Sequence, residues 1–233
     1  MTKLSEIAAA RELFLNLTLR ELRSKYKRSV LGWAWSMLNP LATMAIFSVV
    51  FRFFLKVPVE LGDPSGLKVF AFFLLCGILP FNFLSAGLTS GLTSLVGNAN
   101  LVKKVYFPRE VLVGAIVTSW VVSFLIELAV LSVALLVVGN MVLPWLPIVI
   151  LVVVLQTFFV LGLALVFSVC SVYFRDLEYL STIGLQIWFY LTPIIYPISL
   201  VREEFANRPN LLRLYELNPM TRFVGVYRDL LYH

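Results

Sequence analysis

The 233-residue chain has little charge, one histidine and two cysteines, and each shortage excludes a class of protein. Only 14% of the residues are charged and 60% are hydrophobic, far from the even mixture of a soluble domain. The one histidine is the terminal His233, so no cluster of side chains has the spacing of a metal site. Cys76 and Cys170 both fall inside apolar runs and are best explained as small buried side chains rather than a disulfide. No pattern of a catalytic nucleophile is present, and we expect no enzyme activity in this chain.

A phosphate-binding loop is also missing, because no GxxxxGK[ST] sequence occurs. We therefore expect the chain to bind no metal, nucleotide or other cofactor itself. If ATP drives its function, ATP and Mg²⁺ are bound by a separate partner subunit. We expect no nucleic-acid partner.

Long apolar runs account for most of what is present. About 20 apolar residues make a helix that crosses the hydrocarbon core of a bilayer. Five runs are long enough and nearly free of charge: 35–55, 69–96, 111–138, 146–173 and 180–200. The first begins too late in the chain, and is too long, for a cleaved signal peptide. The prediction is an all-α polytopic membrane protein with five transmembrane helices.

The distribution of charge predicts three regions and their orientation. A basic interfacial segment (1–30) precedes a transmembrane domain (31–200), and an external helical segment (201–233) follows it. In the external segment, Phe223, Val226 and Leu230 indicate a short amphipathic helix after Pro219. The segment before the first span and the turns at 98–110 and 174–181 carry the basic residues that the positive-inside rule places in the cytoplasm. The N-terminus is therefore expected to be cytoplasmic.

The N-terminal segment has the periodicity of an amphipathic helix. Leu15, Leu19, Leu22 and Tyr26 form one helical stripe, with lysine and arginine on the other faces. Such a helix lies in the membrane surface with its basic side chains at anionic headgroups, followed by tryptophans at headgroup depth. The predicted anchors to membrane lipids are Arg20, Arg23, Lys27, Arg28, Trp33 and Trp35. The alternative is a charge cluster that only stops translocation, which needs the charges but not the stripe.

The second and third spans contain residues that suggest a role beyond crossing the membrane. Gly87 and Gly91 form a GxxxG pattern of close helix packing, and Pro80 indicates a kink or break in the same span. Glu127 lies midway across the third span, where an ionised carboxylate costs about 2.5–3.5 kcal/mol. Glu127 either bonds to a neighbouring helix or lines a passage, and its isolation favours the structural interpretation.

The fifth span combines aromatic residues with Pro193 and Pro197, which suggest a bend. Aromatic faces beside hydroxyl groups suit a sugar, although an aromatic belt at the outer interface explains the same pattern. The predicted translocation path consists of Trp188, Tyr190, Tyr196, Phe81 and Glu127.

Two short cytoplasmic turns are candidate docking surfaces for another protein. In "NANLVKKVYFPRE", Tyr106 and Phe107 are large apolar groups beside lysines on a turn that should face water. They either contact a partner or fold back to the headgroups. Pro108 is expected to separate two helices. "FRDLEYLS" at 174–181 forms the second turn on the same side.

Four motifs occur here in a fixed order: "LRELRSKYKRSVLGWAWSMLNPLATM", "NLVKKVYFPREVL", "YFRDLEYL" with the proline-aromatic span, and "LNPMTRF". In this order they resemble the ABC-type polysaccharide-export permeases, the membrane subunits of O-antigen, teichoic-acid and related exporters. The resemblance implies a homodimer in the bacterial cytoplasmic (inner) membrane, partnered by a cytoplasmic nucleotide-binding ATPase. Such a dimer passes a lipid-linked polysaccharide along an aromatic-lined channel.

The resemblance also assigns roles to segments. Residues 4–27 correspond to the interface helix, 98–109 and 175–178 to two coupling helices, and 202–231 to external helices that close the exit. The residues expected to contact the ATPase are Asn98, Asn100, Lys103, Lys104, Tyr106, Phe107, Pro108, Arg109, Arg175, Asp176 and Glu178. The family has a sixth spanning helix that is expected to be missing here, so the 233-residue chain alone is not expected to transport.

Two alternatives stay open at this point. One is an ABC permease for small lipophilic compounds such as drugs. The other is a proton-coupled secondary carrier that uses Glu127, against which the scarcity of other charge inside the spans argues.

Overall fold

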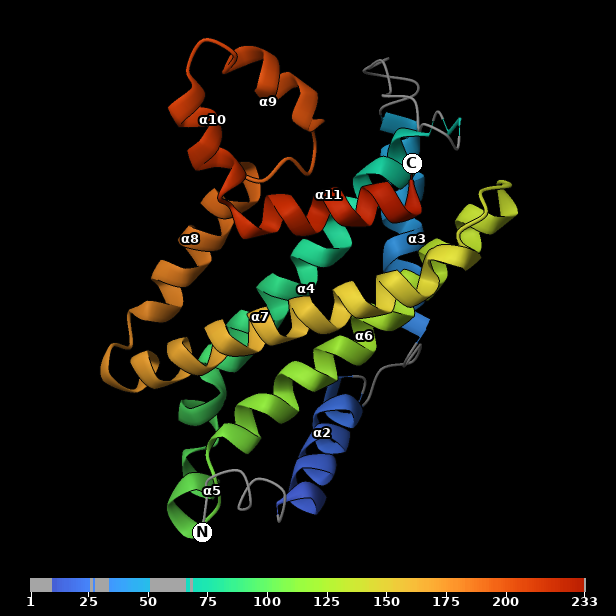
Figure 1. The fold of residues 1–233 in the computed structure, drawn as a ribbon. Helices are drawn as coiled ribbons and strands as arrows, with labels where there is room; N and C mark the ends of the chain where they lie inside the picture. The colour runs from blue at the N-terminus through green and yellow to red at the C-terminus, as the bar shows by residue number, and fades with distance from the viewer. Residues whose placement is uncertain (1–9, 26, 28–33, 51–65, 68, 233) are drawn as a thin grey trace. The chain divides into compact units, whose positions relative to one another are not determined.

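The structure is a computed structural model that describes residues 10–25, 27, 34–50, 66–67 and 69–232 (Figure 1). The elements found among these residues are helical, which confirms the all-α class. The longer helices are α2 (Arg11–Lys25), α3 (Ala34–Val49), α4 (Phe70–Gly97), α6 (Glu110–Val137), α7 (Leu146–Tyr173), α8 (Leu177–Tyr190) and α11 (Pro219–Leu231). The shorter ones are α5 (Ala99–Lys104), the 3₁₀ turn η2 (Leu143–Trp145), α9 (Ile198–Glu204) and α10 (Pro209–Glu216).

Three helices in the described part of the chain are long and apolar enough to cross a membrane. They are Phe70–Gly97, Glu110–Val137 and Leu143–Tyr173, the last of which joins η2 to α7. These helices confirm that the second, third and fourth predicted runs are continuous apolar helices. The first predicted span is helical in α3 as far as Val49, and its last residues lie outside the described part.

The fifth predicted span, 180–200, is wrong as a continuous helix. α8 ends at Tyr190, and α9 begins at Ile198 after a stretch of turns and bends. Pro193 and Pro197 lack a backbone N–H, and a proline ring clashes with the preceding helical turn. The bend expected from these prolines is therefore a break. Pro80, by contrast, lies inside α4, which continues through it without interruption.

The chain divides into two compact units, each of which is described by itself. The first contains Phe83–Ser123, Leu155–Leu185 and the described part of Met1–Trp33. The second contains Phe124–Val154 and the described parts of Ala34–Asn82 and Gln186–His233.

In the first unit, α4 and α7 pack closely along the predicted glycine seam. A Cβ atom on Gly87 would lie 2.7 Å from Cγ1 of Val160, and one on Gly91 would lie 2.6 Å from Cβ of Ala164. The Ser171 hydroxyl of α7 donates a hydrogen bond to the Leu92 carbonyl of α4 at 2.7 Å. The packing role predicted for the two glycines is therefore confirmed.

In the second unit, α11 is part of the core. Met220, Val224, Tyr227 and Leu231 are buried along one face. Tyr227 meets the ring of Phe124 edge-on, with 5.9 Å between the ring centroids. The sequence predicted a short helix after Pro219, which is correct.

The face predicted for α11 is wrong. Phe223, Val226 and Leu230 were expected to form its apolar stripe, but Val226 is exposed and the other two are only half-buried. Apolar residues occur on more than one side of this helix, so their spacing alone did not single out the buried face.

Candidate functional site

The first predicted coupling turn, 98–110, contains a short helix followed by extended chain. Asn98 precedes α5, which ends at Lys104, and Val105 is extended. This change of direction leaves the Tyr106 side chain 96% exposed, beside the exposed Lys103, Lys104 and Arg109.

Phe107 behaves differently from its neighbour. Its ring packs against a buried cluster formed by Leu17 of α2 and by Val111, Leu112 and Ala115 of α6. Of the two aromatic residues expected to form a docking surface, Tyr106 points outward and Phe107 anchors the turn. Pro108 lies just before Glu110, where α6 begins, and separates α5 from α6 as predicted.

Helix α2 packs one face against this same part of the first unit. Leu17 and Leu22 are buried, and a Cβ atom on Gly114 of α6 would lie 3.3 Å from the Phe14 ring. Leu15 and Leu19 are exposed, by 57% and 46%. The predicted stripe is thus only half correct, because Leu22 faces the protein and Tyr26 lies outside the described residues. α2 has two apolar faces, one on the protein and one facing outward.

Arg20 ties α2 to the first turn. Its Nη2 atom donates to Oδ1 of Asn98 at 2.9 Å and to Oε1 of Glu21 at 2.7 Å. The Asn98 amide donates in turn to the Ser94 carbonyl at 2.9 Å. Arg20 was predicted to reach lipid headgroups, but here its guanidinium group links α2 to the start of the first predicted coupling turn.

Lys25 makes a polar contact between α2 and α6. Its Nζ atom donates to the Ser119 carbonyl at 3.0 Å and to Oγ of Ser123 at 3.1 Å, and lies 3.4 Å from the centroid of the Trp120 ring. The Trp120 indole donates to Oγ of Ser90 at 2.9 Å. Sequence reasoning counted Lys25 among the basic residues of the segment, but no signal distinguished it from its neighbours.

The remaining predicted anchors are only partly described. Arg23 and Lys27 are exposed, and the Trp35 side chain at the start of α3 is 52% exposed. Arg28 and Trp33 lie outside the described residues.

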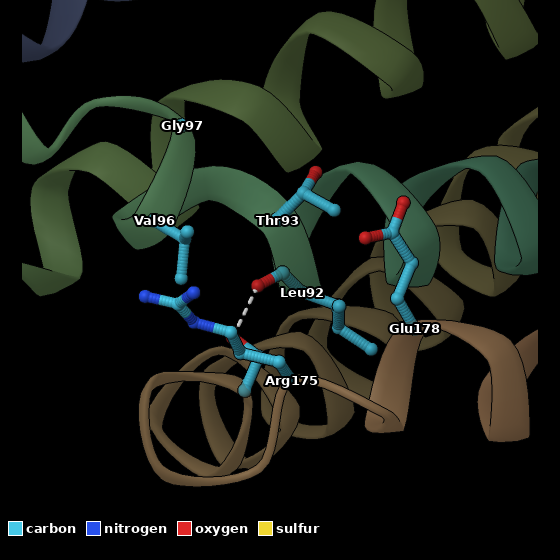
Figure 2. Close-up of a pocket in the computed structure, with 7 residues that line it drawn as sticks. Leu92, Thr93, Val96, Gly97, Arg175 and Glu178 are labelled. Carbon is cyan, nitrogen blue, oxygen red and sulfur yellow. Dashed lines mark hydrogen bonds between the residues drawn. The ribbon is translucent and has the colours of Figure 1, made fainter.

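The second predicted coupling turn borders a cavity in the first unit. The cavity has a volume of about 460 Å³ and is shown in Figure 2. Its lining residues are Leu92, Thr93, Val96, Gly97, Ser171, Arg175 and Glu178. In this view Arg175 and Glu178 lie on opposite sides of Leu92. Since Gly97 directly precedes Asn98, the cavity joins the start of the first turn to the second turn.

Apolar groups are also exposed at the second turn. Tyr173, Phe174 and Tyr179 are 78%, 70% and 76% exposed. Asp176 lines a second hollow of about 660 Å³ together with Arg175 and residues at the end of α7. The predicted residues Arg175, Asp176 and Glu178 are thus surface groups around two neighbouring hollows.

The predicted translocation residues all fall in the second unit. Phe81 is 4% exposed and meets the Phe189 ring edge-on, with 5.2 Å between the centroids. The Tyr190 side chain is 61% exposed. Glu127 is half-buried in α6 and interacts with neighbouring groups.

The polar atoms of Trp188 and Tyr196 are used within the unit. The Trp188 indole donates to Oδ1 of Asn218 at 2.8 Å. The Tyr196 hydroxyl donates to the Tyr190 carbonyl at 2.8 Å and lies 3.2 Å from the Tyr215 hydroxyl. Burial, and then this hydrogen bond with Tyr196, raise the pKa of Tyr215. Among these aromatic residues, Tyr190 is the one whose ring is mostly exposed.

Two polar residues of the second unit were missed by sequence reasoning. Asn218 caps the N-terminus of α11, where its side chain accepts a hydrogen bond from the Met220 N–H. The Asn-Pro pair at 218–219 is a helix-start signal that could have identified it. Arg228 is buried, and its charge in a predicted external helix gave no sign of this. In the described chain, no three His, Cys, Asp or Glu side chains gather as metal ligands would.

Comparison with known proteins identifies the family. The family model described as ABC-2 type transporter matches residues 12–232. This chain belongs to the ABC-2 type transporter family.

Individual relatives of this ABC-2 chain are named as export permeases. Two proteins of Klebsiella pneumoniae, each named O-antigen export system permease protein RfbA, are 30% identical to it over 220 residues, 94% of this chain and 80% of theirs. A protein of the same name from Myxococcus xanthus is 29% identical over 229 residues, 97% of this chain and 83% of its own. The resemblance to ABC-type polysaccharide-export permeases is confirmed, and the chain is a multi-pass membrane subunit of a transporter.

Proposed function

We propose that this ABC-2 permease exports a lipid-linked polysaccharide, an O-antigen or a teichoic-acid-like polymer, across the bacterial cytoplasmic membrane. The observation that carries the substrate class is the 30% identity, over 94% of the chain, to proteins named O-antigen export system permease. The working unit is a homodimer with its N-termini in the cytoplasm. The polymer passes beside the exposed ring of Tyr190, where a sugar face can stack.

The energy for export comes from a separate ATPase subunit that binds ATP and Mg²⁺. This assignment is supported by the absence of a GxxxxGK[ST] loop in the sequence. We place its contact at the coupling surface, defined here as the exposed residues Lys103, Lys104, Tyr106 and Arg109 with the cavity beside Arg175 and Glu178. Exposed aromatic groups next to arginine are typical of protein interfaces.

The contacts of the first turn support its role in transmitting movement of the ATPase to α2 and α6. A push on Tyr106 would pass through Phe107 to the buried cluster at the start of α6. The same turn is linked to α2 by the Arg20–Asn98 hydrogen bond. Because packed side chains resist compression, the turn, α2 and the first residues of α6 are expected to move together.

Depletion of the full-length protein in its own bacterium tests the function. Polymer should accumulate inside the cell and disappear from the surface, as seen by surface labelling and fractionation. A permease for small lipophilic compounds would instead leave the surface polymer unchanged. Glu127→Gln should lower the amount of folded protein at most, whereas complete loss of transport by normally folded protein would favour a proton-coupled carrier.

A further inference from the structure

The break between α8 and α9 leaves backbone carbonyls without helical partners. A continuous helix would pair the Phe189 carbonyl with the N–H of residue 193, and the Pro193 carbonyl with that of residue 197. Both positions are proline and have no N–H to donate. The Phe189 carbonyl accepts instead from the Thr192 N–H at 3.2 Å, so the Pro193 carbonyl is the one that needs a donor from another part of the chain. Away from water, an unpaired carbonyl is costly, so a break of this kind needs donors from elsewhere.

Helix α11 supplies donors to the first part of the break through Asn218. The Asn218 amide nitrogen donates to the Leu191 carbonyl at 3.3 Å and to Oγ1 of Thr192 at 3.1 Å. Its oxygen accepts from the Trp188 indole and from the Met220 N–H, as described above. One side chain therefore caps α11 and holds the end of α8.

Arg228, further along α11, supplies donors to the second part. Its Nη1 atom donates to the Pro193 carbonyl and its Nη2 atom to the Ile194 carbonyl, each at 2.6 Å. Nε donates to the Phe73 carbonyl of α4 at 3.4 Å, and the guanidinium carbon lies 3.6 Å from the centroid of the Phe73 ring. The Pro193 carbonyl, which Pro197 cannot pair, thus receives a charged donor.

The site is shaped to fit a guanidinium group. A Cβ atom on Gly77 of α4 would lie 3.2 Å from Nη2 of Arg228 and 3.3 Å from Cα of Ile194. Two parallel donors in one plane reach two adjacent carbonyls, which a lysine ammonium group cannot reproduce in the same stacked position.

We propose that Arg228 is a positioning residue for transport, which acts by holding the α8–α9 break in one conformation. Arg228 and Asn218 together make α11 a splint for residues 191–196. The break carries Tyr190 at one end and Tyr196 at the other, and the Tyr196 hydroxyl bonds back to the Tyr190 carbonyl. Fixing the break therefore fixes the backbone at Tyr190, from which the exposed ring projects. The consequence for export rests on the proposed function, but the consequence for the break does not.

Cysteine accessibility in the full-length protein tests the splint. Ile194, which is fully buried, is replaced by cysteine in a background that carries Cys76→Ala and Cys170→Ser. Labelling by a water-soluble maleimide in membranes is expressed relative to labelling after SDS denaturation. The test variant is Arg228→Gln. Its control is Arg222→Gln, which removes the same charge from an exposed position of the same helix.

Arg228→Gln should raise the labelling rate of the cysteine at 194 at least about tenfold, equivalent to about 1.4 kcal/mol. Arg222→Gln should change it less than about twofold, because the Arg222 side chain is exposed and its ion pair with Glu216 is long, at 3.7 Å. Equal labelling in the two variants would overturn the proposal.

A second variant covers the case in which Arg228→Gln does not fold, as judged by size-exclusion chromatography in detergent. Arg228→Lys keeps the charge and one hydrogen bond, and should label faster than wild type. Labelling of Arg228→Lys at the wild-type rate would show that no guanidinium-specific hold exists and would contradict the splint.

Two further measurements, of polymer export and of association with the ATPase, complete the test. Arg228→Gln should retain the co-purifying ATPase but lower surface polymer, per molecule of permease in the membrane, about tenfold. Normal export with increased labelling would refute the positioning role. If the wild-type protein itself exports no polymer, the proposed function fails while the labelling result still decides the splint.

Discussion

The glycine seam between α4 and α7 allows us to predict both the sign and the size of a change in stability. Gly91→Ala places a Cβ atom 2.6 Å from Cβ of Ala164 and 3.5 Å from its Cα. Ala164 has no rotamer that could relieve this contact, so the two helices must move apart. Overpacking of this kind costs about 1–3 kcal/mol, and the better helix propensity of alanine offsets about 1 kcal/mol.

The matched control is Gly162→Ala on α7, where an added Cβ atom meets no atom within 4 Å. This variant should gain stability from helix propensity alone, by up to about 1 kcal/mol. The two substitutions are chemically identical and lie in helices of the same unit. Their effects should differ in sign.

The assay measures the apparent melting temperature of the full-length protein in detergent. Samples are heated, and the fraction that stays folded is measured by size-exclusion chromatography. These two contributions leave a net loss of up to about 2 kcal/mol, so Gly91→Ala should melt up to about 8 °C below wild type. Gly162→Ala should melt at the wild-type temperature or above it. If Gly91→Ala is as stable as Gly162→Ala, the close approach of α4 and α7 is incorrect.

Three further substitutions test the coupling surface and its supports. Arg109→Glu should reduce ATPase co-purification about tenfold, while Arg208→Glu in the exposed α9–α10 loop should leave it unchanged; equal retention would remove Arg109 from the interface. Lys25→Met should lower stability by about 1–2 kcal/mol, because the hydrogen bonds to Ser119 and Ser123 and the cation–π contact with Trp120 are lost. Lys27→Met, at an exposed position, should leave stability unchanged. Both are measured by thermal unfolding in detergent. Phe107→Ala should cost about 2–3 kcal/mol because its ring packs on the α2–α6 cluster, and a wild-type melting temperature would show that it is not an anchor.

The parts of the fold that the sequence predicted well are those set by local composition. α4, α6 and α7 follow uninterrupted apolar runs whose length and flanking polar residues define their ends. The turn at 98–110 was likewise located by its charges and by Pro108. In these segments no distant residue is needed to decide the structure.

The parts that could not be predicted depend on residues far apart in sequence. The outward Leu15–Leu19 stripe was visible in α2, but its second apolar face is defined by α6. Similarly, Arg228 reads as a surface charge until the carbonyls of Pro193 and Ile194 are placed beside it. Two prolines predicted a disturbance in the fifth span, but whether a proline bends or breaks a helix depends on which donors are nearby.

Reconstitution most directly tests the claim that this permease makes a path through the membrane and receives its energy from a partner. The full-length protein is placed in lipid vesicles with and without the ATPase subunit, and movement of a lipid-linked polymer is followed by its protection from an added glycosidase. The account predicts ATP-dependent protection only when the ATPase is present. Equal ATP-dependent protection in vesicles that lack the ATPase would contradict it.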